Sequence, residues 1–202
     1  MSDIQEVRMD STADNLKRPL DQRPVSPSLF AHVVLQTANL AAMRQWYLTV
    51  LNARVVEDNG MLCFMTYDEE HHRVAIIEMP GLAARDDKAR GVHHVAYTYA
   101  TLGDLLATYR RLKAQGIEPY WPINHGPTVS LYYRDPDGNS VELQVDVFAT
   151  KQEASAFFHS EAFRANPIGV GFDPEEMVRR YESGVPEQDL MRRGEGPPPP
   201  LP

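Results

Sequence analysis

The feature of the sequence that most restricts its fold is a weak internal repeat. Two apolar segments, residues 30–35 and 92–97, are rich in β-branched and aromatic residues and each contains a histidine, His32 and His94, which is typical of a strand with one functional position. The two histidines are about 60 residues apart, and only two copies are present, so the pattern indicates a duplicated unit and not a solenoid.

A helix is expected after each of these strands. In the first unit Asn39 is the predicted N-cap, and in the second Thr101 and Asp104 form a capping-box pattern with Gly116 at the helix end. Apolar residues recur at helical spacing. They are Leu40, Met43, Tyr47 and Val50 in the first unit, and Leu102, Leu105, Leu106, Tyr109 and Leu112 in the second.

Three strands are expected to follow each helix. The predicted strands are residues 54–57, 61–67 and 73–79 in the first unit, and 117–121, 128–134 and 139–147 in the second. The segment 135–138, Asp-Pro-Asp-Gly, is a strong turn signal between the last two. Both units therefore have the order βαβββ. The predicted fold is α+β, with modules 29–80 and 91–148 forming a curved mixed sheet around one shared cavity.

The segments outside these modules have different compositions. Residues 1–28 are polar and predict a disordered or extended arm, and residues 194–202 are a Pro-rich tail expected to be disordered. Residues 149–193 predict a helical extension. Its signals are one short helix around Phe157 to Phe163 and a second that begins at Asp173, with proline at its first position.

Composition excludes several classes of function. The net charge of −8 argues against nucleic acid as a partner, because phosphate binding requires a basic surface. No segment has the roughly 20 consecutive apolar residues that cross a bilayer, so no membrane association is expected. Cys63 is the single cysteine, so neither an intrachain disulfide nor a cysteine-based zinc site is possible, and a cytoplasmic location is expected.

Three residues have the chemistry and placement of metal ligands. His32 and His94 occupy equivalent positions in the two units, and Glu142 lies in the last strand of the second. Alternation along that strand places Glu142 on the face opposite Val141 and Leu143, where a buried carboxylate needs a partner such as a divalent ion. Two imidazoles and one carboxylate form the ligand set of Fe(II) sites that keep open positions. The predicted metal is Fe(II), with Mn(II) as the second choice.

His93 competes with His94 for the ligand position. Alignment of the two unit starts pairs His32 with His94, and His93 then points to the opposite face. We therefore predict His94 as the ligand. The neighbouring pair His71 and His72 is predicted to lie in a solvated turn.

The segments FAHVVLQT, GVHHVAYTY and NHGPTVSLYYRDPDGNSVELQVD, within two βαβββ units, resemble the vicinal oxygen chelate superfamily of glyoxalases, bleomycin-resistance proteins and dioxygenases. The resemblance covers about residues 29–148. The second half is most similar to one-domain type I extradiol dioxygenases of the biphenyl-2,3-diol kind. That resemblance implies metal ligands at His32, His94 and Glu142, with Tyr132 as a hydrogen-bond donor and His125 as an acid or base.

The same resemblance implies an oxidoreductase that cleaves a catechol-type ring with O2, in a homo-oligomer. Ala75 aligns with Glu142, and this position carries a fourth ligand in the glyoxalase I type, so positions for substrate and O2 stay open. Two alternatives remain: another metal-dependent enzyme of the superfamily (a lyase, isomerase or glyoxalase-like enzyme), or a binding and resistance protein. Aromatic side chains could line a planar pocket. They are Tyr120, Trp121, Phe148 and Phe172.

Overall fold

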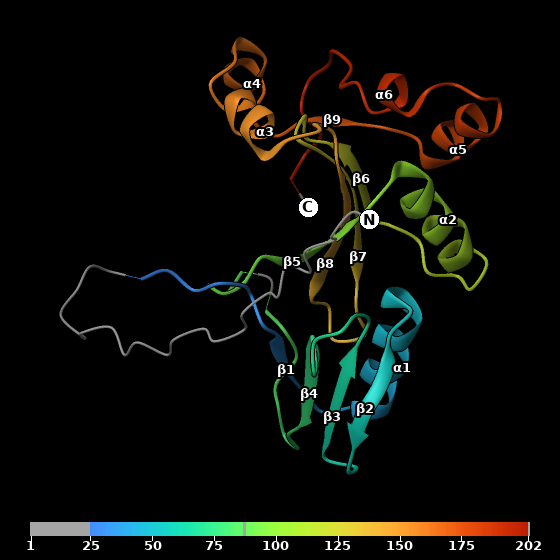
Figure 1. The fold of residues 1–202 in the computed structure, drawn as a ribbon. Coiled ribbons are helices and arrows are strands. Elements are labelled where there is room, and N and C mark those ends of the chain that lie inside the picture. The colour runs from blue at the N-terminus through green and yellow to red at the C-terminus, as the bar shows by residue number, and fades with distance from the viewer. Residues whose placement is uncertain (1–24, 87, 202) are drawn as a thin grey trace, which may run out of the picture. The chain divides into compact units, whose positions relative to one another are not determined.

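The computed structural model describes residues 25–86 and 88–201, and from Ala31 onward they form one compact unit, which is described here by itself. The arm predicted for residues 1–28 lies outside the described residues except for 25–28. Figure 1 shows that the unit contains two sheets. No helix in the described part of the chain is long and apolar enough to cross a membrane.

The first module is a four-stranded sheet with one helix. Its elements are β1 (Val33–Thr37), α1 (Leu40–Leu51), β2 (Arg54–Asp58), β3 (Leu62–Thr66) and β4 (Val74–Glu78). The strand order is β1-β4-β3-β2, and β1 and β4 run parallel.

The second module repeats this order and is followed by the C-terminal extension. Its elements are β5 (His94–Tyr99), α2 (Leu102–Lys113), β6 (Trp121–Asn124), β7 (Thr128–Arg134) and β8 (Ser140–Asp146). The extension contains α3 (Lys151–Phe157), α4 (Glu161–Ala165), β9 (Val170–Gly171), α5 (Pro174–Glu182) and α6 (Glu187–Leu190). The sheet order is β5-β8-β7-β6-β9, so the extension supplies its fifth strand.

The α+β class and the two βαβββ units predicted from the sequence are confirmed. The strand registers of the two modules are also equivalent. Val34 pairs with Ala75 in the first module, and Ala96 pairs with Glu142 in the second. Since Val34 and Ala96 each lie two residues after a histidine, the structure supports the alignment of His32 with His94 and of Ala75 with Glu142.

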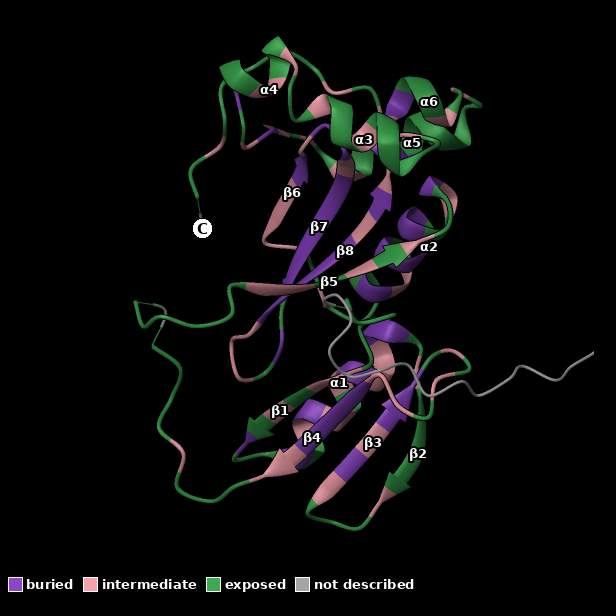
Figure 2. Ribbon diagram, turned by 60° about the vertical axis from the view of Figure 1, so that its left-hand side comes forward, coloured by how far each residue is buried: buried purple, intermediate pink, exposed green. Residues whose placement is uncertain are grey.

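The helices begin where the sequence predicts. The side chain of Asn39 accepts a hydrogen bond from the backbone of Ala42, and that of Thr101 accepts one from Asp104. The apolar faces of both helices are buried against the sheets, as the purple segments of Figure 2 show. The core continues across the inner faces of β7 and β8.

Hydrogen bonds from Tyr47 and Arg111 join the modules. The hydroxyl of Tyr47 on α1 donates to Asp135, 3.1 Å away in the turn between β7 and β8. Arg111 on α2 donates to the carbonyl oxygens of Thr49 and Val50 at the end of α1, at 2.5 and 3.2 Å. The second contact caps a helix end with a cation, which also suits the helix dipole.

The structure differs from the predicted elements at three places. The strand predicted at 117–121 lies further along the chain, as β6 (Trp121–Asn124). The chain after Gly116 pairs with β7 only from Tyr120, whose amide donates to the carbonyl of Tyr132. The helix predicted around Phe157 is two helices, since Ser160 caps a new one by accepting from the amide of Phe163. Strand β9 and helix α6 were not predicted.

Candidate metal centre

One row of side chains crosses the second sheet and defines the site. The register places Trp121 opposite Tyr132 and Tyr132 opposite Glu142, and Glu142 opposite Ala96 on β5. Directly paired residues share a face, with Cβ atoms about 4.5–5.5 Å apart. The aromatic residues and the carboxylate are therefore neighbours although they come from three strands.

His94 joins this row from the edge strand β5. It precedes Ala96 by two residues and so shares the face of Glu142. Its Nε2 lies 3.1 Å from Oε2 of Glu142, whose side chain is only 5% exposed against 33% for His94. His93 is exposed and contacts this pair only through the Nδ1 of His94, at 2.8 Å. The structure thus places His94, and not His93, beside the carboxylate.

Glu142 is a buried carboxylate that its neighbours keep ionised. Burial alone raises its pKa, but hydrogen bonds from His94 and the Ser130 hydroxyl, together with electrostatic interaction with the His94 and His125 side chains, lower the pKa below its usual range. A buried, ionised carboxylate is also a suitable donor for a divalent ion.

Tyr132 and His125 form a pair next to these two residues. The hydroxyl of Tyr132 lies 3.1 Å from Nε2 of His125, and its ring lies 5.2 Å from that of His94 between centroids. Burial and the neighbouring Glu142 carboxylate raise the pKa of Tyr132, so its hydroxyl stays protonated and can donate a hydrogen bond.

Two of the four aromatic residues considered as pocket lining surround Tyr132. The ring of Trp121 lies 5.0 Å from that of Tyr132, and that of Tyr120 lies 6.3 Å away. The indole nitrogen of Trp121 is buried without a hydrogen-bond partner among the described residues. In contrast, Phe148 packs on Phe157 in the extension, and Phe172 packs against the hydrophobic core.

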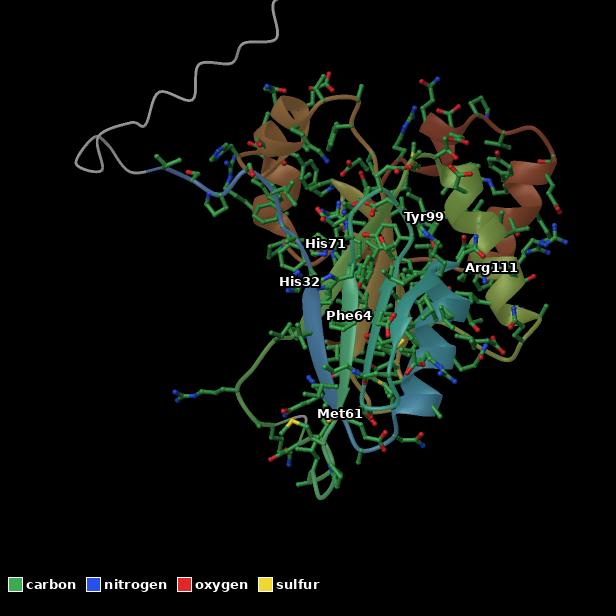
Figure 3. All side chains as sticks on the ribbon, turned by 60° about the horizontal axis from the view of Figure 1, so that its bottom comes forward. His32, Met61, Phe64, His71, Tyr99 and Arg111 are labelled. Atoms are coloured by element: carbon green, nitrogen blue, oxygen red, sulfur yellow. The ribbon has the colours of Figure 1, made fainter. Side chains whose placement is uncertain are left out.

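His32 lies at the start of β1 on the first sheet, near His71 and Phe64 (Figure 3). Its ring is 4.2 Å from that of His72 and 6.4 Å from that of His71. Its Nδ1 is buried and has no hydrogen-bond partner among the described residues. Within those residues no three His, Cys, Asp or Glu side chains are close enough together to hold a metal, so His32 of this chain does not join His94 and Glu142.

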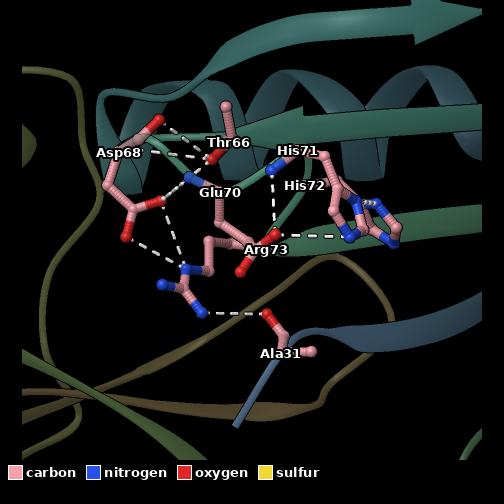
Figure 4. A network of polar contacts seen from close by, with 7 residues as sticks. All are labelled: Ala31, Thr66, Asp68, Glu70, His71, His72 and Arg73. Atoms are coloured by element: carbon pink, nitrogen blue, oxygen red, sulfur yellow. Dashed lines mark hydrogen bonds and ion pairs between the residues drawn. The ribbon is translucent and has the colours of Figure 1, made fainter. Parts of the chain in front are cut away.

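A network of hydrogen bonds and ion pairs fixes the chain segments next to His32 (Figure 4). Arg73 binds the Asp68 carboxylate at 3.0 Å and donates to the carbonyl of Ala31, also at 3.0 Å. The predicted turn at His71 and His72 is present, and His71 is mostly exposed. Burial, with His32 and His71 nearby, lowers the pKa of His72. The amide of Val33 donates to the carbonyl of Arg73 at 3.0 Å, so the backbone is held on both sides of His32.

The donor set of His94 and Glu142 fits a divalent metal. An imidazole and a buried, ionised carboxylate already face one another, and the unpartnered Nδ1 of His32 is a third donor of the same class. His32 and His94 occupy equivalent positions of the two modules.

Comparison with known proteins identifies the family of the chain. A profile of the Glyoxalase/Bleomycin resistance protein/Dioxygenase superfamily matches residues 29–143. The chain belongs to this superfamily. It is 55% identical over 158 residues to "Biphenyl-2,3-diol 1,2-dioxygenase 2" of Rhodococcus globerulus, a match that covers 78% of this chain and 83% of that protein. It is 51% identical over 171 residues to "Biphenyl-2,3-diol 1,2-dioxygenase 3" of the same organism, covering 84% and 90%.

A solved structure of the superfamily shares the fold. The glyoxalase/bleomycin resistance protein/dioxygenase domain from Frankia sp. EAN1pec matches with a TM-score of 0.51 and 20% identity, over 60% of this chain and 99% of that one. The family model ends at residue 143, so the C-terminal extension lies outside the part of the chain that it matches.

Several residues of the site carry no signal in the sequence. Ser130 contributes to the environment of Glu142, and its position opposite Gln144 follows only from the β7–β8 register. The carbonyl oxygen of Ile168, 2.5 Å from Nδ1 of His125, comes from the extension. A backbone carbonyl has no side-chain signature, so only the structure reveals this contact.

Proposed function

We propose that this protein is an extradiol ring-cleaving dioxygenase that acts on a catechol-type diol with O2 and uses Fe(II). The observation that carries the proposal is the convergence of His94, Glu142, Tyr132 and His125 on one face of the second sheet. The names of the two Rhodococcus globerulus relatives support the same reaction and an aromatic diol as the substrate.

Each residue has a role that follows from its atoms. His94 and Glu142 hold the metal, which when bound supplies a common attachment point for the diol and O2 and a path for electrons between them. Tyr132 is a protonated donor that orients an oxygen of the substrate. His125 accepts a proton from the diol, because an imidazole nitrogen beside the bound substrate can act as a general base. Trp121 and Tyr120 provide flat apolar surface for a ring.

The third ligand is His32 from a second copy of the chain. His32 and His94 both lie at edge strands, β1 and β5, and the outer side of β1 is uncovered in the described residues, with Val34 55% exposed. An uncovered apolar edge is a common interface between copies. A dimer in which the two sheets meet in this way would join the unpartnered His32 to the pair on β5 and β8. The protein is accordingly a homo-oligomer.

The residue Ala75 distinguishes this site from sites with four protein ligands. It occupies the position in the first module that Glu142 occupies in the second, and a methyl group cannot bind a metal. The coordination positions that it leaves open suit a bidentate diol together with O2.

The deciding experiment is anaerobic loading with Fe(II), followed by oxygen uptake with 2,3-dihydroxybiphenyl, catechol and 3-methylcatechol. We expect one O2 consumed per diol and a coloured ring-opened product. Tight binding of a diol without oxygen uptake would reject the dioxygenase and favour a non-oxidative metal enzyme. Absence of any binding would reject a diol substrate.

A matched pair of variants on β8 tests the metal ligand. Glu142→Gln removes the carboxylate, and we expect iron affinity to fall by more than about 100-fold, beyond the effect of changes outside the ligand shell. Gln144→Ala alters the same face two residues away, where the side chain donates to the Thr98 hydroxyl at 2.9 Å. It should keep its iron. Equal iron content in the two variants would exclude Glu142 as a ligand.

A further inference from the structure

The imidazole of His125 is held at both nitrogens. Its Nδ1 lies 2.5 Å from the carbonyl oxygen of Ile168, and its Nε2 lies 3.1 Å from the hydroxyl of Tyr132. A carbonyl oxygen can only accept, so Nδ1 must carry a hydrogen. In the neutral ring Nε2 then has a free lone pair, which faces the Tyr132 hydroxyl.

The Ile168 carbonyl is placed by a turn built around Asn166. Asn166 is 7% exposed, and its Oδ1 accepts from the amides of Ile168 and Gly169 at 3.1 and 2.8 Å. Its Nδ2 donates to the carbonyl of Gly169 at 2.8 Å and to that of Gly196 at 3.2 Å. These bonds use every donor and acceptor of the amide, so the side chain specifies the turn.

The turn also lies in close backbone contact with the loop that carries His125. Gly169 has φ +128°, and a Cβ there would lie 2.5 Å from the carbonyl oxygen of Asn124 and 2.9 Å from Cα of His125. The next residue, Val170, pairs with Asn124 as β9 joins β6. Only glycine permits this close approach of the two backbones.

Arg193 also connects the turn at Asn166 to the loop that carries His125. Its guanidinium donates to the carbonyl of Asn166 at 2.9 Å and to that of His125 at 3.4 Å. The extension therefore contacts His125 at its backbone and at its ring.

We infer that the C-terminal extension is part of the active site, and that Asn166 is a positioning residue that fixes the tautomer of His125 through the Ile168 carbonyl. Nε2, on the side of Tyr132, is then the ring atom that takes up a proton. When a diol hydroxyl is deprotonated, its O–H bond breaks, an N–H bond forms at Nε2, and the ring becomes an imidazolium. The proton transfer from the diol rests on the proposed function, whereas the assignment of the tautomer does not.

The tautomer is measured by long-range ¹H–¹⁵N NMR of full-length protein labelled at histidine and supplied with diamagnetic Zn(II). The ring is titrated to its neutral form, and its signals are assigned by their loss in His125→Gln. We expect a protonated Nδ1 and a bare Nε2. In Asn166→Ala the two nitrogen shifts should move toward each other as the tautomers exchange, and kcat for a diol should fall about 10- to 100-fold with little change in KM.

Two glycines provide an independent test with a matched control. Gly169→Ala displaces the same carbonyl by a clash and should disturb the His125 signals. Gly184→Ala imposes a comparable backbone penalty at φ +86°, but a Cβ there has nothing within 4 Å. It should leave the His125 signals and kcat unchanged.

The inference is overturned if the wild-type ring carries its proton on Nε2, a result that requires no variant. It is also overturned if folded Asn166→Ala and Gly169→Ala both keep the wild-type pattern. Circular dichroism shows whether either variant is unfolded. If one is, the His125 signals of the folded variant decide the question. Because the NMR needs no substrate, a failure of ring cleavage and a failure of the tautomer assignment are separate results.

Discussion

Adjacent tyrosines on β7 face opposite sides of the sheet. Tyr132 points to Glu142, His94 and His125, whereas Tyr133 is fully buried in the core with a hydroxyl that lacks a hydrogen-bond partner among the described residues. Alternation along one strand thus places the phenol that we propose to act on the substrate on one face and a core phenol on the other. This difference permits a test in which the same chemical change is made at neighbouring positions.

We expect Tyr132→Phe to retain iron and to lower kcat by about 100-fold, as is typical when an oriented proton donor is lost. The variant removes one oxygen atom and leaves the ring contacts to Trp121 and His94 in place. Iron content and oxygen uptake with a diol are the two measurements.

The control is Tyr133→Phe. It should keep its turnover, and its free energy of unfolding should stay within about 1 kcal/mol of the wild type or rise, because an unpaired buried hydroxyl is removed. If Tyr132→Phe retained wild-type kcat, or if both variants lost activity equally, Tyr132 would have no specific role.

At the scale of elements, the turn between β7 and β8 connects the two modules. Asp135 accepts from the amides of Asp137 and Asn139 at 3.0 and 2.8 Å, and from the Tyr47 hydroxyl of α1 at 3.1 Å. Burial raises the pKa of Asp135, and this outweighs the hydrogen bonds that lower it. The Tyr47 bond stabilises the ionised carboxylate in the folded state only.

We therefore expect Tyr47→Phe to lower the free energy of unfolding by about 1.5–3 kcal/mol at neutral pH, the usual range for a hydrogen bond to a charged group. The loss should shrink as the pH falls through the pKa of Asp135, since the protonated carboxyl no longer needs this donor. Urea unfolding at neutral and acidic pH measures it. A loss that is the same at both pH values would show that packing, and not this hydrogen bond, is responsible.

The sequence predicted best those elements whose ends have local chemistry. Strand β7 has the predicted bounds because an Asp-Pro-Asp-Gly turn follows it, and α1 and α2 begin at predicted capping residues. Strand β9 was missed because two residues paired across a long loop leave no periodic pattern. The shared face of Glu142 and Tyr132 follows from alternation and register, but the role of Asn166 depends on a backbone carbonyl.

At the scale of the whole molecule, the proposed ligand set is divided between two modules. His32 lies with His71 and His72 on the first sheet, and His94 lies with Glu142 on the second. If a second copy supplies His32, each dimer has two sites. Each site is then formed by the first module of one chain and the second module of the other. This arrangement can be tested without a structure of the dimer.

We expect His32→Ala and His94→Ala to be inactive separately and to regain activity when unfolded and refolded together. In a mixed dimer, one site would have both substitutions and the other would have neither. Iron content and oxygen uptake should thus recover to about a quarter of the wild-type value, for random pairing with one intact site in every mixed dimer.

Two wild-type chains refolded with the same procedure provide the reference for recovery. Sedimentation of the mixture should give a dimer or a larger even assembly. Lack of recovery in a mixture that does form mixed dimers would show that all three ligands come from one chain.

Strand β9 also has a consequence for the order in which a new chain becomes competent. Both modules leave the ribosome before the segment that orients His125, and the roughly 30 residues from Glu142 to Gly171 take roughly 2–6 s to synthesise at bacterial to eukaryotic rates. During that interval the carboxylate row can form while His125 is free to exchange its ring proton between both nitrogens. Under the proposed function, the strands that carry His94 and Glu142 would then be synthesised before the segment that fixes the tautomer of His125.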